Sequence, residues 1–125
     1  MKPSRKQIWL LFDKHCAYCG KELQDYSGKN MHIDHVEALI RSSFTGIPLF
    51  PGNKRSDNIF PSCPQCNNYK SNLSIEEFRL MVKETLRKLE RVTLYRNAIR
   101  FGFIEVKEWD EKFYFEKQRS HERHL

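Results

Sequence analysis

The chain has 125 residues, of which 39% are hydrophobic and 30% are charged, and its formal net charge is +6. This length fits one domain, or one domain with a tail, and the composition is too apolar for a wholly disordered chain and too polar for a membrane span. The longest apolar run, Ile8–Phe12, is shorter than the ~7–15 apolar residues of a signal peptide, so we expect a reducing, cytoplasmic location.

The first third of the chain predicts one helix and one strand. Residues 4–14 have the apolar spacing of an amphipathic helix, with Ser4 as its N-cap and Ile8 on its buried face. Residues 31–34 predict a short strand, because they follow a cluster of turn-forming residues at 27–30.

A long loop and a second strand are expected next. Residues 41–57 contain Gly and Pro without periodicity, which is typical of a loop, and long loops in compact domains tend to be functional. Residues 58–61 predict the returning strand. A short helix then begins at Cys66 and runs through Asn67 and Lys70.

The clearest helix begins after Ser74, since Ser74 and Glu77 form a capping box ahead of an apolar stripe. We expect it to extend as far as Arg100. Residues 103–106 and 113–115 then predict a hairpin, followed by a frayed polar tail at 118–125. No linker or internal repeat divides the chain, so a single domain, 1–125, is expected.

Four cysteines form two C-x-x-C pairs, Cys16 with Cys19 and Cys63 with Cys66. In a reducing compartment such pairs favour a metal over disulfides, and Zn²⁺ prefers four thiolates in a tetrahedron. The role would be structural, because four thiolates leave no open position for water or substrate. A redox motif and four buried free thiols are the alternatives.

Residues that suit phosphodiester hydrolysis lie between and just after these pairs. Histidine is the natural base, because its ordinary pKa of about 6.5 is close to working pH. Asp and Asn offer the hard oxygen ligands that Mg²⁺ and Mn²⁺ prefer. The candidates are His32, Asp34, His35, Asn58 and Asn67. Asp34 and His35 are neighbours on a strand, so both can serve one site only if the chain bends at His35.

The order of these motifs over residues 16–71 resembles the HNH endonucleases, in the zinc-ribbon-bearing branch of the ββα-metal nucleases. The resemblance implies a small α+β fold, in which two antiparallel strands and a helix hold one divalent cation and a four-cysteine zinc site braces them. It implies that His35 is the general base, that Asp34 and Asn67 bind the catalytic Mg²⁺ or Mn²⁺, and that Asn58 fixes the loop that orients the histidine.

The same resemblance places Lys70 near the nucleic-acid backbone, and Lys54 or Arg55 in the long loop would add positive charge there. The final His of the family motif is Asn67 here, and Glu37 and Ala38 stand where many members have a proline after the Asp-His pair. Residues 72–125 match no motif and would be an accessory helix and hairpin that contribute to DNA grip or docking.

The sequence therefore predicts a metal-dependent HNH endonuclease that acts on DNA, most simply double-stranded DNA. One metal site per chain makes a nick the simplest event, and a double-strand break would need dimerisation or two encounters. A homodimer and an unidentified protein partner are both left open. The rival hypothesis is a zinc-ribbon module that binds nucleic acid or a protein and cuts nothing. A nuclease fold that has lost its activity is the third.

Overall fold

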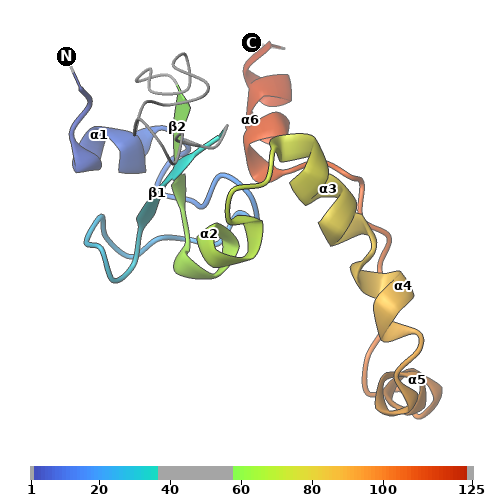
Figure 1. The fold of residues 1–125 in the computed structure, drawn as a ribbon. Helices are drawn as coiled ribbons and strands as arrows, with labels where there is room; N and C mark the ends of the chain where they lie inside the picture. Colours follow the sequence, from blue (N-terminus) through green and yellow to red (C-terminus); the bar gives the residue numbers. More distant parts are fainter. Residues whose placement is uncertain (1, 37–57, 124–125) are drawn as a thin grey trace, which may run out of the picture.

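The structure is a computed structural model, and it describes residues 2–36 and 58–123 (Figure 1). In these two ranges a two-stranded sheet is accompanied by six helices. The elements in chain order are α1 (Arg5–Leu10), β1 (His32–His35), β2 (Ile59–Ser62), α2 (Pro64–Lys70), α3 (Ile75–Lys83), α4 (Thr85–Leu89), α5 (Thr93–Arg100) and α6 (Tyr114–Arg123). None of the helices in the described ranges is long and apolar enough to cross a membrane.

Helix α1 begins as predicted and ends four residues earlier than expected. Ser4 and Gln7 form a reciprocal capping box at its start. Asp13 and Lys14 have φ angles of 52° and 68°, which no α-helix can contain, so the predicted extension to residue 14 is wrong. These left-handed residues turn the chain toward the first cysteine pair.

The two predicted strands exist and pair in antiparallel fashion, each shifted by one residue from its expected range. Asp34 lies opposite Phe60, and His35 lies opposite Ile59. Beyond the last pair, the Val36 N–H donates to the carbonyl of Asn58 at 3.1 Å. The expected loop over 41–57, with Lys54 and Arg55, lies outside the described residues.

Helix α2 begins two residues before its expected start. Cys63 is the N-cap, and its Sγ accepts a hydrogen bond from the Cys66 N–H at 3.3 Å. Pro64 occupies the first helical turn, where its missing N–H costs nothing. The second cysteine pair is therefore the first turn of a helix, and Asn67 and Lys70 follow on that helix.

The single long helix expected over residues 74–100 is three shorter helices. The capping box of Ser74 and Glu77 starts α3 as predicted. The chain leaves helical geometry at Val92, whose φ and ψ are −93° and 120°, and Thr93 then starts α5. Adjacent β-branched residues are poor helix formers, which explains a break at this point. Figure 1 shows α4 and α5 leading away from the sheet.

The expected C-terminal hairpin is wrong. In the described structure, residues 103–112 form no strand, and 113–115 pair with the first cysteine pair instead. The N–H groups of Tyr114 and Phe115 donate to the carbonyls of Tyr18 and Ala17, at 3.1 and 2.8 Å. Helix α6 then occupies much of the segment expected as a polar tail. Burial of Phe113 and Phe115 provides the physical reason for this placement.

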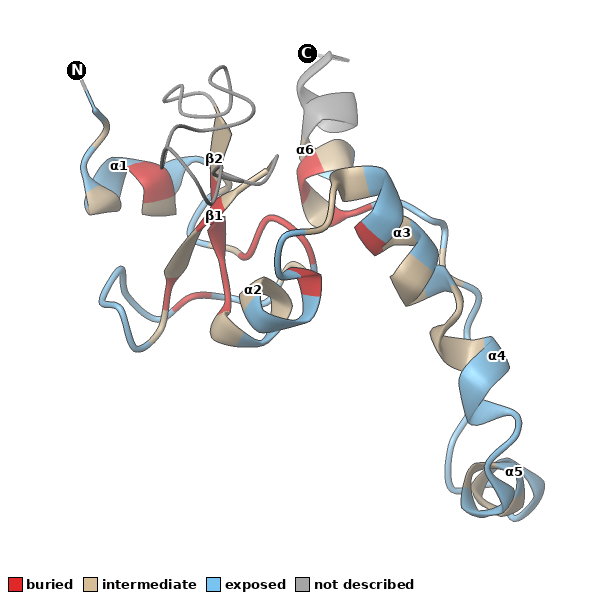
Figure 2. Cartoon of the chain, in the orientation of Figure 1, coloured by how far each residue is buried: buried red, intermediate tan, exposed pale blue. Residues whose placement is uncertain are grey.

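An aromatic cluster joins the parts of the chain into one hydrophobic core (Figure 2). Phe78 of α3 stacks on Phe113 with ring centroids 5.1 Å apart, and Phe60 of β2 lies 4.9 Å from Phe115. The Tyr18 ring meets Phe78 and Phe113 edge-on. Such pairs contribute about 0.5–1.5 kcal/mol each beyond their buried area. The core therefore fixes the first cysteine pair against β2 and α3.

Candidate functional site

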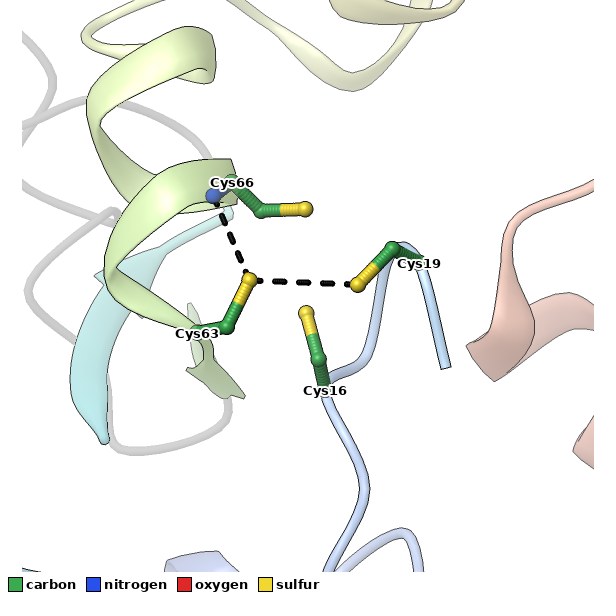
Figure 3. Close-up of side chains that lie close together, drawn as sticks. All are labelled: Cys16, Cys19, Cys63 and Cys66. Carbon is green, nitrogen blue, oxygen red and sulfur yellow. Dashed lines mark hydrogen bonds between the residues drawn. The ribbon is translucent and has the colours of Figure 1, made fainter. Parts of the chain in front are cut away.

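The four cysteines converge between the first turn of α2 and the loop that follows α1 (Figure 3). Their sulfur atoms all lie within 4.8 Å of one another, and Sγ of Cys19 is 3.8 Å from Sγ of Cys63. A disulfide bond needs a separation of about 2.05 Å, so these two thiols are not bonded. Tetrahedral metal–sulfur bonds of about 2.3 Å would place the sulfurs about 3.8 Å apart. The cluster can therefore hold one metal ion.

Backbone N–H groups support the sulfurs at this site. The Tyr18 N–H donates to Sγ of Cys16, and the Lys21 N–H donates to Sγ of Cys19, both at 3.4 Å. Hydrogen bonds of this kind stabilise thiolates, the form in which cysteine binds a metal. Four such ligands complete a tetrahedral shell, so the arrangement is suited to a structural role.

Gly20 lets the first cysteine pair turn under the C-terminal segment. Its φ of 79° lies in the left-handed region, where a side chain is strained. A Cβ atom at this position would also lie 2.9 Å from Cδ2 of Tyr114. Both effects restrict the position to glycine.

Asp34 lies on β1 in a buried polar cluster with Tyr18 and Lys70. The Tyr18 hydroxyl donates to Oδ2 of Asp34, and Nζ of Lys70 lies 3.2 Å from the same oxygen. Nζ of Lys70 also donates to the His35 carbonyl at 3.2 Å. Only 4% of Asp34 and none of Lys70 is exposed. The lysine thus neutralises the carboxylate inside the fold.

Burial raises the pKa of Asp34, and the Tyr18 hydroxyl and the Lys70 charge oppose that rise. The pKa of Tyr18 is raised by its own burial and by the adjacent carboxylate, both of which disfavour a phenolate. Tyr18 therefore remains a hydrogen-bond donor to Asp34 at neutral pH. Sequence reasoning missed Tyr18, and its position between Cys16 and Cys19 is the one signal that tied it to the site.

The position of Lys70 near the nucleic-acid backbone stays a prediction, and the structure places this side chain in the interior, with none of it exposed. Its charge is used by Asp34 across the β1–α2 interface. The family position of Lys70 gave no information on this partner.

His32 and Asn67 form a second contact between β1 and α2. Nδ1 of His32 lies 3.1 Å from Nδ2 of Asn67. From the sequence alone, His32 could be either a partner of the site residues or a solvated histidine. Its contact with Asn67 favours a partner of the site. Two side-chain pairs thus connect β1 and α2: His32 with Asn67, and Asp34 with Lys70. Both pairs can form because residues two apart share a strand face and residues three apart share a helix face.

His35 is the last residue of β1, and the chain bends at the next residue, Val36. The His35 ring is close enough to Asp34 to lower the pKa of that carboxyl, although neighbouring residues inside a strand face opposite sides of the sheet. Among the described residues, its half-buried ring makes no hydrogen bond to Asp34 or Asn67. Asn58 joins the two ends of the undescribed segment through its carbonyl bond with Val36.

Residues 16–73 match the family model of the HNH endonucleases. These residues are an HNH domain. The matched range contains both cysteine pairs, both strands and α2, and the match indicates a nuclease-type fold for these residues. The comparisons with curated proteins and with solved structures gave no match.

Proposed function

We propose that this HNH domain is an endonuclease that hydrolyses phosphodiester bonds of DNA. The observation that carries the proposal is that the cysteine cluster holds α2 against the rest of the domain at the helix turn just before Asn67. Cys63 caps that helix, and Asn67 follows Cys66 directly. A metal bound by the four cysteines would thus fix Asn67 relative to β1, the strand of Asp34 and His35. We assign Zn²⁺ to the cluster, which would place the domain in the zinc-ribbon branch of the family.

Asp34 and Asn67 fit a hard divalent cation by donor type. Among the described residues, the contacts of Asp34 with Tyr18 and Lys70 both use Oδ2, and Asn67 contacts His32 through its amide nitrogen. Each residue therefore keeps one side-chain oxygen outside these contacts. They would hold one Mg²⁺ or Mn²⁺, which would supply positive charge next to the scissile phosphate. One such site per chain makes a nick in double-stranded DNA the simplest product, and a break of both strands would need a second copy.

His35 is the residue we assign to take a proton from the attacking water. Asn58 would support it by holding Val36, the residue that follows His35, through the backbone bond between them. His32 is the competing candidate, because it is the histidine in contact with Asn67. A contact with the neutral amide indicates a positioning role for His32 rather than proton transfer.

One observation favours the alternative of a zinc module that binds without cutting. Lys70 already neutralises Asp34, and a carboxylate with a lysine partner binds a cation less strongly than a free one. The two hypotheses differ in their expectation for cleavage, so one assay separates them.

The test is nicking of supercoiled plasmid by purified protein of measured zinc content, with Mg²⁺, with Mn²⁺ and without either. Wild type, His35→Ala, His32→Ala and Asp34→Asn are compared, with His15→Ala as a matched control. His15 takes no part in the two side-chain pairs between β1 and α2, and its ring is hydrogen-bonded to the Asp13 carbonyl. We expect metal-dependent nicking by wild type and the control, and a loss of about 10²–10⁴-fold in His35→Ala, the usual contribution of a general base.

Full activity of His35→Ala would remove His35 from the mechanism. Loss in His32→Ala alone would transfer the base role to that residue. Zinc-loaded wild type that nicks with neither cation would support the binding module.

A further inference from the structure

The segment 84–108, here called the arm, contains α4, α5 and the chain that returns from them. Figure 1 shows it projecting away from the sheet and α2, and Figure 2 shows that exposed residues dominate it. Three large apolar side chains at its end are open to solvent: Leu94 is 79% exposed, Phe101 is 70% exposed and Phe103 is 83% exposed. Exposed apolar side chains that gather in one place mark an interaction surface.

The tip of the arm, residues 91–104, also carries an excess of positive charge, and Glu90 and Glu105 stand at its two boundaries. It contains three arginines and no Asp or Glu. The Arg96 guanidinium bonds the Glu90 carbonyl and the Thr93 hydroxyl, and that of Arg100 bonds the Asn97 side-chain oxygen. In the part of the chain that the structure describes, none of the three arginines pairs with a carboxylate. The charge is thus available to an anionic partner.

Arginine and aromatic side chains occur together at this tip. The Arg100 guanidinium carbon lies 5.2 Å from the centroid of the Phe101 ring, which holds a cation beside an exposed aromatic face. Cations for phosphates and aromatic faces for bases are the two components of sequence-tolerant nucleic-acid binding.

We propose that the tip of the arm binds the DNA substrate at positions where bases are unpaired or unstacked. The arginines contact phosphates, and Phe101 and Phe103 stack on bases. This inference deepens the proposed function and rests on it for the identity of the substrate. An intact duplex covers its base faces, so these rings favour a gap, a flap or a kinked step over regular double-stranded DNA.

A second copy of the chain is a poorer occupant for this surface. A symmetric dimer through the tip would bring the three arginines of one copy against those of the other, with no acid in either segment to offset them. The cavity between α5 and the returning chain is lined by Glu90 and Glu105 and by none of these arginines, so we exclude it from the DNA surface.

The first test measures binding by fluorescence anisotropy, without added divalent cation, to a short duplex and to the same duplex with a single-stranded gap. Phe101→Ser/Phe103→Ser is compared with wild type and with Leu10→Ser/Leu11→Ser. The two leucines, 47% and 53% exposed, lie at the end of α1 and are the control for the loss of exposed apolar side chains away from the arm. We expect wild type and control to prefer the gapped DNA by about tenfold or more, and the phenylalanine variant to lose that preference.

The second test concerns the arginines. Arg96→Ala/Arg100→Ala should weaken binding to both DNAs and reduce the salt dependence by about one phosphate contact for each arginine. Lys2→Ala/Lys6→Ala removes the same charge near the N-terminus. This control should retain more of the DNA affinity and more of the salt dependence than the arginine variant does. Equal thermal melting of the variants would confirm that their folds are intact.

Two results would overturn the inference. One is unchanged preference for gapped DNA in the phenylalanine variant. The other is a wild-type dimer in light scattering that the variant loses while its DNA affinity stays constant, which would assign the tip to a second copy. Failure of the proposed function is a separate result, because zinc-loaded protein that binds gapped DNA through the arm and nicks no plasmid would retain this surface without the nuclease.

Discussion

Nζ of Lys70 lies 3.2 Å from Oδ2 of Asp34, and both side chains are withdrawn from solvent. The pair connects α2 to β1, the two elements that hold Asp34, His35 and Asn67, the candidates for catalytic-metal binding and proton transfer. A buried ion pair contributes little net stability when both partners are present, but loss of one partner leaves an uncompensated charge inside the protein. The position of Asp34 therefore depends on Lys70.

Replacement of one partner should be more harmful than replacement of both. We expect Lys70→Met to lower the free energy of unfolding by about 3–5 kcal/mol, because it leaves the Asp34 carboxylate unpaired. Lys70→Met combined with Asp34→Asn should recover much of that loss. Urea unfolding of the zinc-loaded proteins measures both changes. Equal destabilisation by the single and double variants would show that the two side chains are not coupled.

Tyr18→Phe removes one hydroxyl and keeps the ring in the aromatic core. A hydrogen bond to a charged group contributes about 1.5–3 kcal/mol, and we expect a loss of this size in unfolding free energy, with zinc content unchanged. Tyr26→Phe, at an exposed tyrosine that packs against Trp9, is the matched control and should have little effect. An unchanged free energy of unfolding in Tyr18→Phe would mean that Lys70 alone holds the Asp34 carboxylate.

Removal of the metal that we assign to the cysteine cluster should unfold the domain. A bound metal would join the loop after α1 to the start of α2, and without it the cysteines become protonated thiols and that link is lost. Chelation should abolish cooperative thermal unfolding, and Cys63→Ser should do the same, since Cys63 also caps α2. A metal assay should give one zinc per chain. A chelated protein with an unchanged melting temperature would contradict the structural role.

His32→Ala should reduce nicking without abolishing it. The ring holds the Asn67 carboxamide, and residues that orient a metal ligand usually account for 10–100-fold in activity or metal affinity, so we expect a loss of about that size. The loss should appear mainly as a higher Mg²⁺ requirement, measured by titration of the cation. His32→Gln, which can still bond the amide, should regain part of the affinity. An unchanged Mg²⁺ requirement in His32→Ala would show that the contact has no part in the site.

Acid should weaken the start of α3 through Glu77. Its hydrogen bonds with Ser74 lower its pKa, so its carboxylate stabilises the folded state above the pKa of the unfolded chain, about 4.3. That stability is lost as the pH falls through the lower pKa of the folded state. Glu77→Gln should therefore be less stable than wild type at neutral pH, and the difference should disappear in strong acid. Unfolding measured across this pH range gives the comparison, and a difference independent of pH would exclude the charge as the cause.

Local signals in the sequence predicted much of the fold correctly. Ser4 and Ser74 start helices where their capping patterns indicate, and the two short strands are within one residue of their expected ranges. These features depend on neighbours a few residues apart, which the sequence displays directly. The convergence of the cysteines also followed from spacing, because each C-x-x-C pair forms one turn.

Features that depend on distant partners were not predictable in the same way. Residues 113–115 have the composition of a strand, and the choice between pairing with 103–106 and packing on Tyr18 depends on a core that only the folded chain assembles. Lys70 has the sequence signature of a surface cation, and its burial requires Asp34 on another element. The tertiary environment determined both outcomes.

The contact of Phe115 with Ala17 has a consequence for the order of events during synthesis. All four cysteines leave the ribosome well before residues 113–115, so a nascent chain can bind metal while the aromatic cluster above the first pair is still open. Phe60 and Phe78 are then exposed until the last segment arrives to cover them. A nascent chain stalled before residue 113 should therefore be an intermediate that can bind metal but is prone to aggregation. Once residues 113–115 leave the ribosome, they can pack on the aromatic cluster and close the core.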